Sequence, residues 1–228
     1  GVDRLLHPLV VGFHGAAGHR ARPGLLHRER PHLGRRQGQQ VEALEQAGAH
    51  VIYSREGLKV HCKLCLIERG EKGRTRRYAW LGTGNFNEQT VQIYGDLGLF
   101  TASEPLARDV LTVFAHLRDP RKPLATKHLM TAPTGLRGGI ERLIDREIAN
   151  ALSGKEAAIL LKLNSLGDRP LIRKLYDASR AGVRIRLIVR GICCLVPGVE
   201  GMSANIEVIS IIDRFLEHAR AYVFHNNG

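Results

Sequence analysis

The residue types best suited to chemistry in this chain are a histidine and a lysine two positions apart. They lie in the stretch from Val60 to Ile67, whose apolar residues predict a β-strand. Because the side chains of a strand alternate between its faces, His61 and Lys63 are expected to project together. A neutral imidazole can attack phosphorus, and a neighbouring ammonium can hold phosphate oxygens. The pair favours phosphoryl-transfer chemistry, although an ordinary surface strand could carry the same two residues.

A similar arrangement recurs near the other end of the chain. The stretch from Glu217 to Phe224 also predicts a strand, on which His218 and Arg220 would share one face. Two strands that each carry a histidine followed by a cation suggest two related domains, one in each half of the chain. We expect such domains to bring the two histidines to one cleft.

A glycine-rich segment, Gly82 to Glu88, follows the first of these strands. Its turns would expose backbone amides to anions, and side chains such as Asn85 can donate hydrogen bonds to phosphate oxygens. The segment lacks the Gly-Lys-Ser/Thr ending of a P-loop, and alone it could be only a tight turn. Its place after the strand with His61 and Lys63 favours phosphate binding.

An arginine ends a strongly apolar stretch in the second half. Residues Arg184 to Arg190 predict a buried strand that is followed by Gly191. Ligands of α/β sheets bind at the carboxyl ends of strands, and a guanidinium group suits phosphate. Arg190 is therefore a candidate phosphate ligand, and its alternative interpretation is a surface arginine in a very basic protein.

The four cysteines do not predict a metal site. Cys62 and Cys65 have the spacing of a zinc knuckle or redox pair. On a strand they would point to opposite faces, and the adjacent Cys193 and Cys194 cannot readily chelate one ion together. A structural zinc site needs four convergent ligands, so we expect small buried hydrophobic residues instead. Four cysteines in a chain of this length make no disulfide framework, which favours a reducing cytoplasm.

The elements that must position these residues alternate between helix and strand, which predicts an α/β fold. A hairpin turn is expected at Gly70–Gly73 and a linker at Asp119–Pro123. The predicted helices cover 40–48 (the end of a helix), 104–117, 140–152 and 169–181. The predicted strands are His50–Tyr53, Lys59–Glu68, Thr75–Leu81, Ala157–Leu163, Val183–Val189, Glu207–Ile212 and Glu217–Phe224, with a turn at Arg55–Gly57.

The charge of the chain favours a polyanionic partner. Its 228 residues carry 34 Lys and Arg against 22 Asp and Glu, a formal net charge of +12. Residues 1–40 contribute strongly to this excess, yet they show neither helical nor strand periodicity and are rich in Arg, Gly, His and Pro. A metal-binding tract and a basic nucleic-acid arm are alternatives for this segment, and we prefer out-of-frame translation or a misplaced start. No signal peptide or membrane-spanning run is apparent.

With these residues together, the sequence from about Val41 to Gly228 closely resembles polyphosphate kinase. The motifs that carry the resemblance are Gly57–Lys63, Leu81–Glu88, Asp145–Ala151, Leu161–Asn164, Leu187–Cys193 and Ser210–His218. The catalytic half of that family consists of two phospholipase-D-like α/β domains. The resemblance implies a first catalytic domain at 41–123 with a damaged N-terminal part, and a second, truncated one at 124–228.

The resemblance also implies roles for individual residues. His61 matches the histidine that is phosphorylated, and His218 matches the second active-site histidine. Tyr94, within Gln92–Asp96, and Arg190 match residues that contact nucleotide phosphates. The implied reaction is reversible transfer of the ATP γ-phosphate through phospho-His61 to inorganic polyphosphate, with ADP as the other product and Mg²⁺ offsetting charge. Lys63, Arg190 and Arg220 could surround the transferred phosphoryl group, and the metal-site residues stay unassigned.

Three departures from the family pattern concern its scaffold. Residues 1–40 do not match, the family's N-terminal domains are absent, and the family continues beyond Gly228. Because misplacement by about an ångström can cost on the order of 100-fold in rate, we expect this fragment by itself to be inactive. The resemblance implies a cytoplasmic homo-oligomer without a transmembrane segment, for which peripheral membrane association stays open.

Two other functions are compatible with parts of the sequence. A phospholipase-D-like phosphodiesterase would use the same histidines and hydrolyse the intermediate with water, but the matches at Tyr94 and Arg190 favour the kinase. A non-catalytic, basic nucleic-acid-binding module would also suit the charge. Aromatic residues make up only 5% of the chain, and no aromatic-basic platform is evident, so nucleic acid is not the expected partner.

Overall fold

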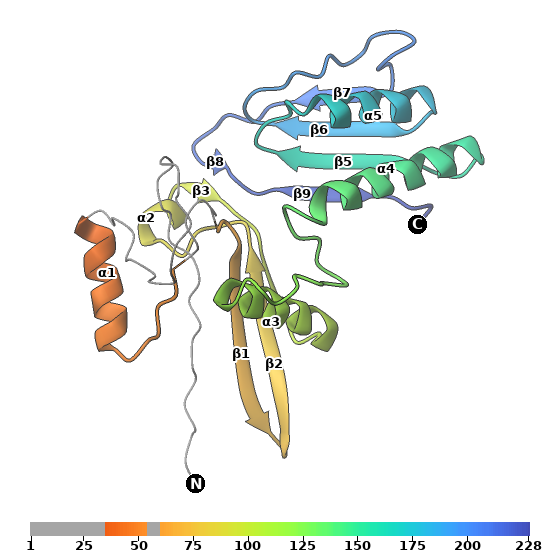
Figure 1. The fold of residues 1–228 in the computed structure, drawn as a ribbon. Helices are drawn as coiled ribbons and strands as arrows, with labels where there is room; N and C mark the ends of the chain where they lie inside the picture. The colour runs from red at the N-terminus through yellow and green to blue at the C-terminus, as the bar shows by residue number, and fades with distance from the viewer. Residues whose placement is uncertain (1–34, 54–59) are drawn as a thin grey trace, which may run out of the picture. The chain divides into compact units, whose positions relative to one another are not determined.

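The computed structural model describes residues 35–53 and 60–228 (Figure 1). The predicted turn at Arg55–Gly57, the start of the strand at Lys59 and most of the segment 1–40 lie outside these residues. The chain forms two compact units. One takes the described residues up to Gly82 together with Gly98–Leu129, and the other takes Thr83–Leu97 together with Met130–Gly228. No helix of the described part is long and apolar enough to cross a membrane.

The first unit is built on an antiparallel sheet with the strand order β1-β2-β4. Strand β1 spans Lys63–Glu71, β2 spans Arg74–Gly82 and β4 spans Gly98–Thr101. Lys72 and Gly73 join β1 to β2 with positive φ angles of 48° and 75°. Two residues with positive φ match the twist of paired strands, so the predicted hairpin turn is confirmed.

One helix, α3 (Glu104–Arg118), packs along this sheet (Figure 1). It confirms the helix predicted at 104–117. Alternate residues of the strands point toward it, because side chains of a strand alternate between faces. The buried side chains of this core are Leu64, Leu66, Ala79, Ala107, Val110, Val113 and Phe114.

The beginning of the described chain differs from the prediction. Helix α1 (Arg35–Gln46) starts within the segment that was expected to lack periodic structure. Gly48, with a φ of 84°, follows it as the predicted stop. The strand predicted at His50–Tyr53 is wrong, since residues 49–53 have no regular structure. A short apolar run becomes a strand only where a neighbouring strand pairs with its backbone groups, and sequence alone does not supply that partner.

The second unit contains a four-stranded sheet with the order β7-β6-β5-β9. Strands β5 (Ala158–Leu163), β6 (Arg184–Val189) and β7 (Ile206–Ile209) are parallel, and β9 (Ala221–Phe224) runs antiparallel to β5. Helices α4 (Leu136–Leu152) and α5 (Arg169–Arg180) pack on one face of this sheet (Figure 1). These helices confirm the two predicted for this half.

A separate pair of short parallel strands completes the second unit. Strand β3 (Tyr94–Gly95) pairs with β8 (Leu216–Glu217), and the short helix α2 (Glu88–Val91) precedes β3. Two strand predictions are partly wrong. The strand predicted at Glu207–Ile212 ends at Ile209. The strand predicted at Glu217–Phe224 is divided between β8 and β9. Both units combine helices with sheet, so the α/β class is confirmed.

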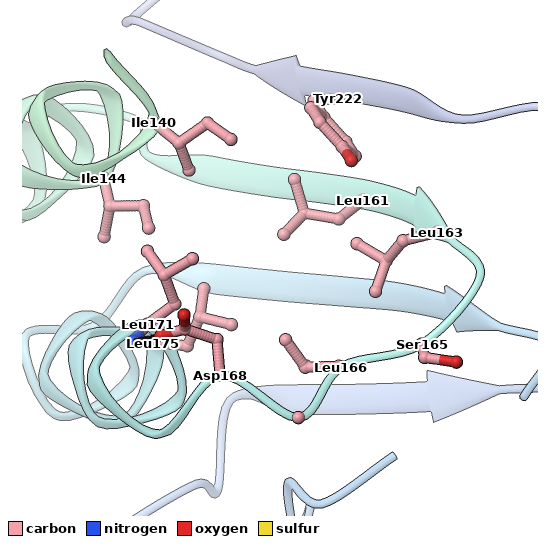
Figure 2. A pocket seen from close by; sticks show the side chains of 11 residues that line it. Ile140, Ile144, Leu161, Leu163, Ser165, Leu166, Asp168, Leu171, Leu175 and Tyr222 are labelled. Carbon is pink, nitrogen blue, oxygen red and sulfur yellow. Dashed lines mark hydrogen bonds between the residues drawn. The ribbon is translucent and has the colours of Figure 1, made fainter. Parts of the chain in front are cut away.

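The core of the second unit lies between its sheet and its two helices. Figure 2 shows apolar side chains from α4, α5 and β5 around a pocket, with Tyr222 of β9 at its side. The pocket has a volume of about 180 Å³. Asp168 also borders it, but its carboxylate accepts from the Leu171 amide at the start of α5 and pairs with Arg137. His218, Tyr94 and Arg190 do not line this pocket, which is mainly a gap in an apolar core.

A buried glutamate joins helix α4 to the sheet. Glu147 has no exposed surface, and its two carboxylate oxygens accept hydrogen bonds from the amides of Ala158 and Asn226 at 3.2 and 2.8 Å. These amides lie at the start of β5 and after β9. The carboxylate thus satisfies two backbone donors that would otherwise be costly to bury.

We predict that Glu147→Ala destabilises the protein by about 3 kcal/mol, because two buried amides lose their acceptor. Urea denaturation measures the free energy of unfolding. Glu141→Ala removes a surface pair with Arg137 on the same helix. It is the matched control and should change the free energy of unfolding by less than about 0.5 kcal/mol. Equal effects of the two substitutions would contradict this account of Glu147.

A second buried carboxylate fixes the segment that follows α3. Asp109 is 6% exposed and accepts hydrogen bonds from the amides of Lys127, His128 and Leu129 at 2.5 to 3.2 Å. Burial alone would raise the pKa of this carboxyl, but the three amides favour the charged form and hold the pKa below its ordinary value.

A depressed folded-state pKa means that Asp109 contributes stability above the ordinary pKa of an aspartate and loses it as the pH falls through the folded-state value. We predict that Asp109→Asn costs on the order of 2 kcal/mol at pH 7. The difference between wild type and variant should shrink below about pH 4. Urea denaturation across this range measures it, and a difference that is constant with pH would refute the prediction.

Candidate active site

In the first unit, His61 and Lys63 lie side by side, though not for the reason predicted. His61 is exposed and precedes β1, while Lys63 is the first residue of that strand and is 9% exposed. The Lys63 ammonium donates to the His61 carbonyl at 2.7 Å and lies 3.2 Å from both ring nitrogens. The lysine side chain, folded back along the backbone, holds the pair together.

The end of the ladder explains why the strand starts late. Lys63 pairs with Gly82, the last residue of β2. Residues 60–62 therefore have no partner in that ladder, and the expectation that His61 and Lys63 share a strand face is wrong. What results is still a histidine with an ammonium beside its ring, an arrangement that can hold a phosphoryl group at an imidazole nitrogen.

In the second unit, His218 is buried beside residues from a distant part of the sequence. It is 7% exposed, and its Nδ1 lies 2.7 Å from Oδ1 of Asp96. The ring of Tyr94 lies 4.9 Å from the His218 ring, centroid to centroid. The pairing of β3 with β8 creates this arrangement, and the amides of His218 and Ala219 both donate to the Gly95 carbonyl.

Asp96 was not singled out from the sequence as a functional residue. The available signal was its position two residues after Tyr94, in a segment that resembled the family. Because a carboxylate only accepts hydrogen bonds, the bond to Asp96 places the proton of a neutral His218 on Nδ1. The lone pair then lies on Nε2, which is 3.5 Å from a guanidinium nitrogen of Arg220.

The glycine-rich segment supports this carboxylate. The Thr83 hydroxyl donates to Asp96 Oδ1 at 2.7 Å and accepts from the Leu97 amide at 2.9 Å. A Cβ on Gly84 would lie 2.9 Å from Asp96 Oδ2, so glycine permits the close approach. The Asn87 side chain accepts from two amides and begins α2. Asn85 is half-buried, and its predicted contact with phosphate stays a prediction.

The predicted strand that carries His218 is interrupted at the histidine itself. β8 ends at Glu217 and β9 begins at Ala221, and each pairs with a different sheet. His218 and Arg220 therefore do not share the face of one strand, and that expectation is wrong. The chain bends between them because β8 pairs with β3 while β9 pairs with β5. A guanidinium nitrogen of Arg220 then lies 3.5 Å from Nε2 of His218.

Arg190 lies at the carboxyl edge of the parallel strands, as predicted. It follows β6 directly, is half-buried, and donates from Nε to the Asn164 side chain at 3.0 Å. Asn164 follows the neighbouring strand β5, so adjacent strand ends supply both residues. The bond to Asn164 uses Nε, and the predicted contact of Arg190 with phosphate stays a prediction.

The comparisons with known proteins decide the family. The model of "Polyphosphate kinase C-terminal domain 1" matches residues 37–123, and that of "Polyphosphate kinase C-terminal domain 2" matches residues 129–228. The chain belongs to the polyphosphate kinase family. This confirms the family resemblance that the motifs predicted, while the exact domain boundary at 123 and 124 stays a prediction.

Curated polyphosphate kinases are close relatives but much longer proteins. The enzyme of Vibrio cholerae serotype O1 is 56% identical over 185 residues, which are 81% of this chain and 26% of that protein. The enzyme of Escherichia coli strain K12 is 49% identical over 188 residues, 82% of this chain and 27% of the relative. The chain thus spans about a quarter of the length of the curated relatives it matches.

A solved structure supports the fold. The crystal structure of polyphosphate kinase from Porphyromonas gingivalis matches with a TM-score of 0.78 and 41% sequence identity. The match covers 88% of this chain and 33% of that structure's chain. The α/β elements described above are therefore those of a polyphosphate kinase.

The cysteines of this polyphosphate kinase relative are less buried than predicted. Cys62 and Cys194 are exposed, and Cys65 and Cys193 are half-buried. The predicted strand did not include Cys62 in the structure, since β1 begins only at Lys63, and the expected burial of Cys62 is wrong. Within residues 35–53 and 60–228, no three or more His, Cys, Asp or Glu side chains are gathered as metal ligands.

We predict that Asp96→Asn abolishes the preference of neutral His218 for the Nδ1–H tautomer. An asparagine can present its NH₂ group, and an acceptor nitrogen then becomes favourable at Nδ1. The ¹⁵N chemical shifts of the His218 ring report the tautomer in NMR spectra. Asp145→Asn, which alters a surface pair with Lys174, should leave these shifts unchanged. Unaltered shifts in Asp96→Asn would show that Asp96 does not set the tautomer.

Proposed function

We propose that these residues serve the reversible transfer of the γ-phosphate of ATP to inorganic polyphosphate through phospho-His61. The observation that carries the proposal is the Lys63 ammonium beside both ring nitrogens of His61. Membership of the polyphosphate kinase family supports the choice of donor and acceptor. The activity is proposed for the protein to which these two C-terminal domains belong.

The proposed chemistry has two steps that balance. An imidazole nitrogen of His61 attacks the γ-phosphorus, the bond to the bridging oxygen breaks, and ADP leaves with the electron pair. A terminal oxygen of polyphosphate then attacks the phosphohistidine, and the nitrogen–phosphorus bond breaks to regenerate neutral His61. Run backward, the same steps form ATP. Lys63 would stabilise the charge on the equatorial oxygens of a loose transition state.

The second unit would supply contacts to phosphate. Arg190 offers terminal guanidinium nitrogens, and Tyr94 offers its hydroxyl. His218 would act through Nε2, since Asp96 occupies Nδ1. A neutral Nε2 can accept a proton, and an imidazolium beside a carboxylate can hold phosphate or protonate a leaving oxygen. Arg220, close to Nε2, adds positive charge at the same nitrogen.

Magnesium enters this proposal only as the ion that accompanies the nucleotide. The described residues do not gather three or more carboxylate, His or Cys ligands, so they do not make a protein-only site. Mg²⁺ usually retains waters and binds through substrate phosphates, which fits delivery as Mg-ATP. We further propose a cytoplasmic location and a homo-oligomer for the whole protein, on the family relationship and the free cysteines.

The decisive experiment incubates the chain and its full-length counterpart with γ-labelled ATP and Mg²⁺. Acid-labile, alkali-stable label is then mapped. We expect label on His61 that His61→Ala removes. The label should persist in His116→Ala, which alters a half-buried histidine on α3. Chase with polyphosphate should transfer the label to the polymer, whereas release as inorganic phosphate would indicate a phosphodiesterase.

Because the chain spans about a quarter of its relatives, we expect the full-length protein to label and this chain alone to label weakly or not at all. Label in both forms would show that the two C-terminal domains suffice. If the full-length protein carries no label at His61, the proposed function is wrong.

A further inference from the structure

One lysine side chain contacts both residues that flank His218. Lys162 Nζ lies 2.9 Å from the Glu217 carboxylate and donates to the Ala219 carbonyl at 3.1 Å. The Lys162 side chain is 16% exposed, and that of Glu217 is 30% exposed. An ammonium group has three donors. One contacts the Glu217 side chain and another the Ala219 backbone, on either side of the buried histidine.

The place of His218 in the fold gives these contacts their importance. His218 lies between β8, which pairs with β3, and β9, which pairs with β5. Residues 218–220 belong to neither strand. On the side of β3, the Gly95 carbonyl accepts hydrogen bonds from two amides, and the Asp96 carboxylate is hydrogen-bonded to the His218 ring. Toward the four-stranded sheet, Lys162 of β5 spans the break, since it pairs with Ala221, the first residue of β9.

We propose that Lys162 is a positioning residue that sets His218 relative to the carboxyl edge of the four-stranded sheet, where Arg190 lies. The ion pair with Glu217 and the bond to Ala219 hold the bend between β8 and β9 in one conformation. A partly buried ion pair adds little net stability, so its main effect is geometric. The positioning of His218 by Lys162 does not depend on the proposed function, whereas its consequence for phosphate transfer rests on that function.

A direct phosphate contact is the other role that a lysine at this edge could have. Its ammonium, however, is directed to a carboxylate and a carbonyl within hydrogen-bond distance. A phosphate ligand would lower nucleotide affinity when removed, whereas a positioning residue lowers the rate of transfer. The two roles therefore separate in KM against kcat.

The first test measures where the His218 ring lies. Tyr94, 4.9 Å away, shifts the Cε1–H signal of His218 in NMR spectra, and His218→Gln assigns that signal. We expect Lys162→Met to move the signal toward the value of a free histidine. Lys162→Arg, which keeps a cation and donors, should restore most of the original shift. Lys174→Met, which breaks a comparable pair with Asp145, should leave the signal in place.

A second substitution keeps the test decisive if Lys162→Met prevents folding. Glu217→Gln preserves an acceptor for Lys162 while removing the charge, and we expect a partial displacement of the same signal. In the double variant the two effects should be less than additive, because both remove one interaction. A folded Lys162→Met or, failing that, a Glu217→Gln variant with an unmoved His218 signal would overturn the proposal.

The catalytic consequence is measured in the protein form that labels at His61. Displacement of a reacting group by about an ångström can cost on the order of 100-fold, so Lys162→Met should slow transfer by roughly 10- to 100-fold with KM for ATP little changed. A raised KM with unchanged kcat would assign Lys162 to phosphate binding instead. Absence of labelling in the wild type would count against the proposed function, while the NMR signal would still decide the position of His218.

Discussion

The arrangement around His218 depends on a hydrogen bond between the Asp96 carboxylate and the His218 ring. The two residues are far apart in the sequence, and the bond requires that the segment Thr83–Leu97 leave the sheet of the first unit and pair with β8. A buried imidazole needs a partner for each polar ring atom. The carboxylate supplies one at Nδ1 and thereby directs the other nitrogen, Nε2, toward Arg220.

The glycine-rich segment is explained by the same bond. Thr83 orients the carboxylate, and Gly84 leaves room for it. Such a segment can look like a phosphate-binding loop because both uses need small residues and exposed donors. In this fold, the Thr83 hydroxyl of the segment forms its hydrogen bonds within the protein. Asp96, rather than phosphate, is the acceptor that the Thr83 hydroxyl contacts.

Carboxylates and ammonium groups repeatedly satisfy backbone groups where regular pairing stops. Glu147 accepts two amides at the margins of the sheet, and Asp109 accepts three in the segment after α3. Lys63 donates to the carbonyl of His61 itself, and Lys162 donates to the carbonyl of Ala219, next to His218. Backbone groups without a ladder partner need such acceptors and donors, and the histidines lie where strands end or break.

The sequence by itself determined the α/β class, the main helices, the hairpin turn and the family, because these follow from periodicity, turn residues and motifs of neighbouring residues. It also identified His61 and His218 as the residues to examine. The tertiary structure decided where strands begin and end: β1 starts at Lys63 because β2 ends at Gly82, and β8 and β9 separate because they pair with different sheets. It alone brought Asp96 and Lys162 to His218. Strand limits and long-range contacts depend on partners distant in the sequence, and local patterns do not specify those partners.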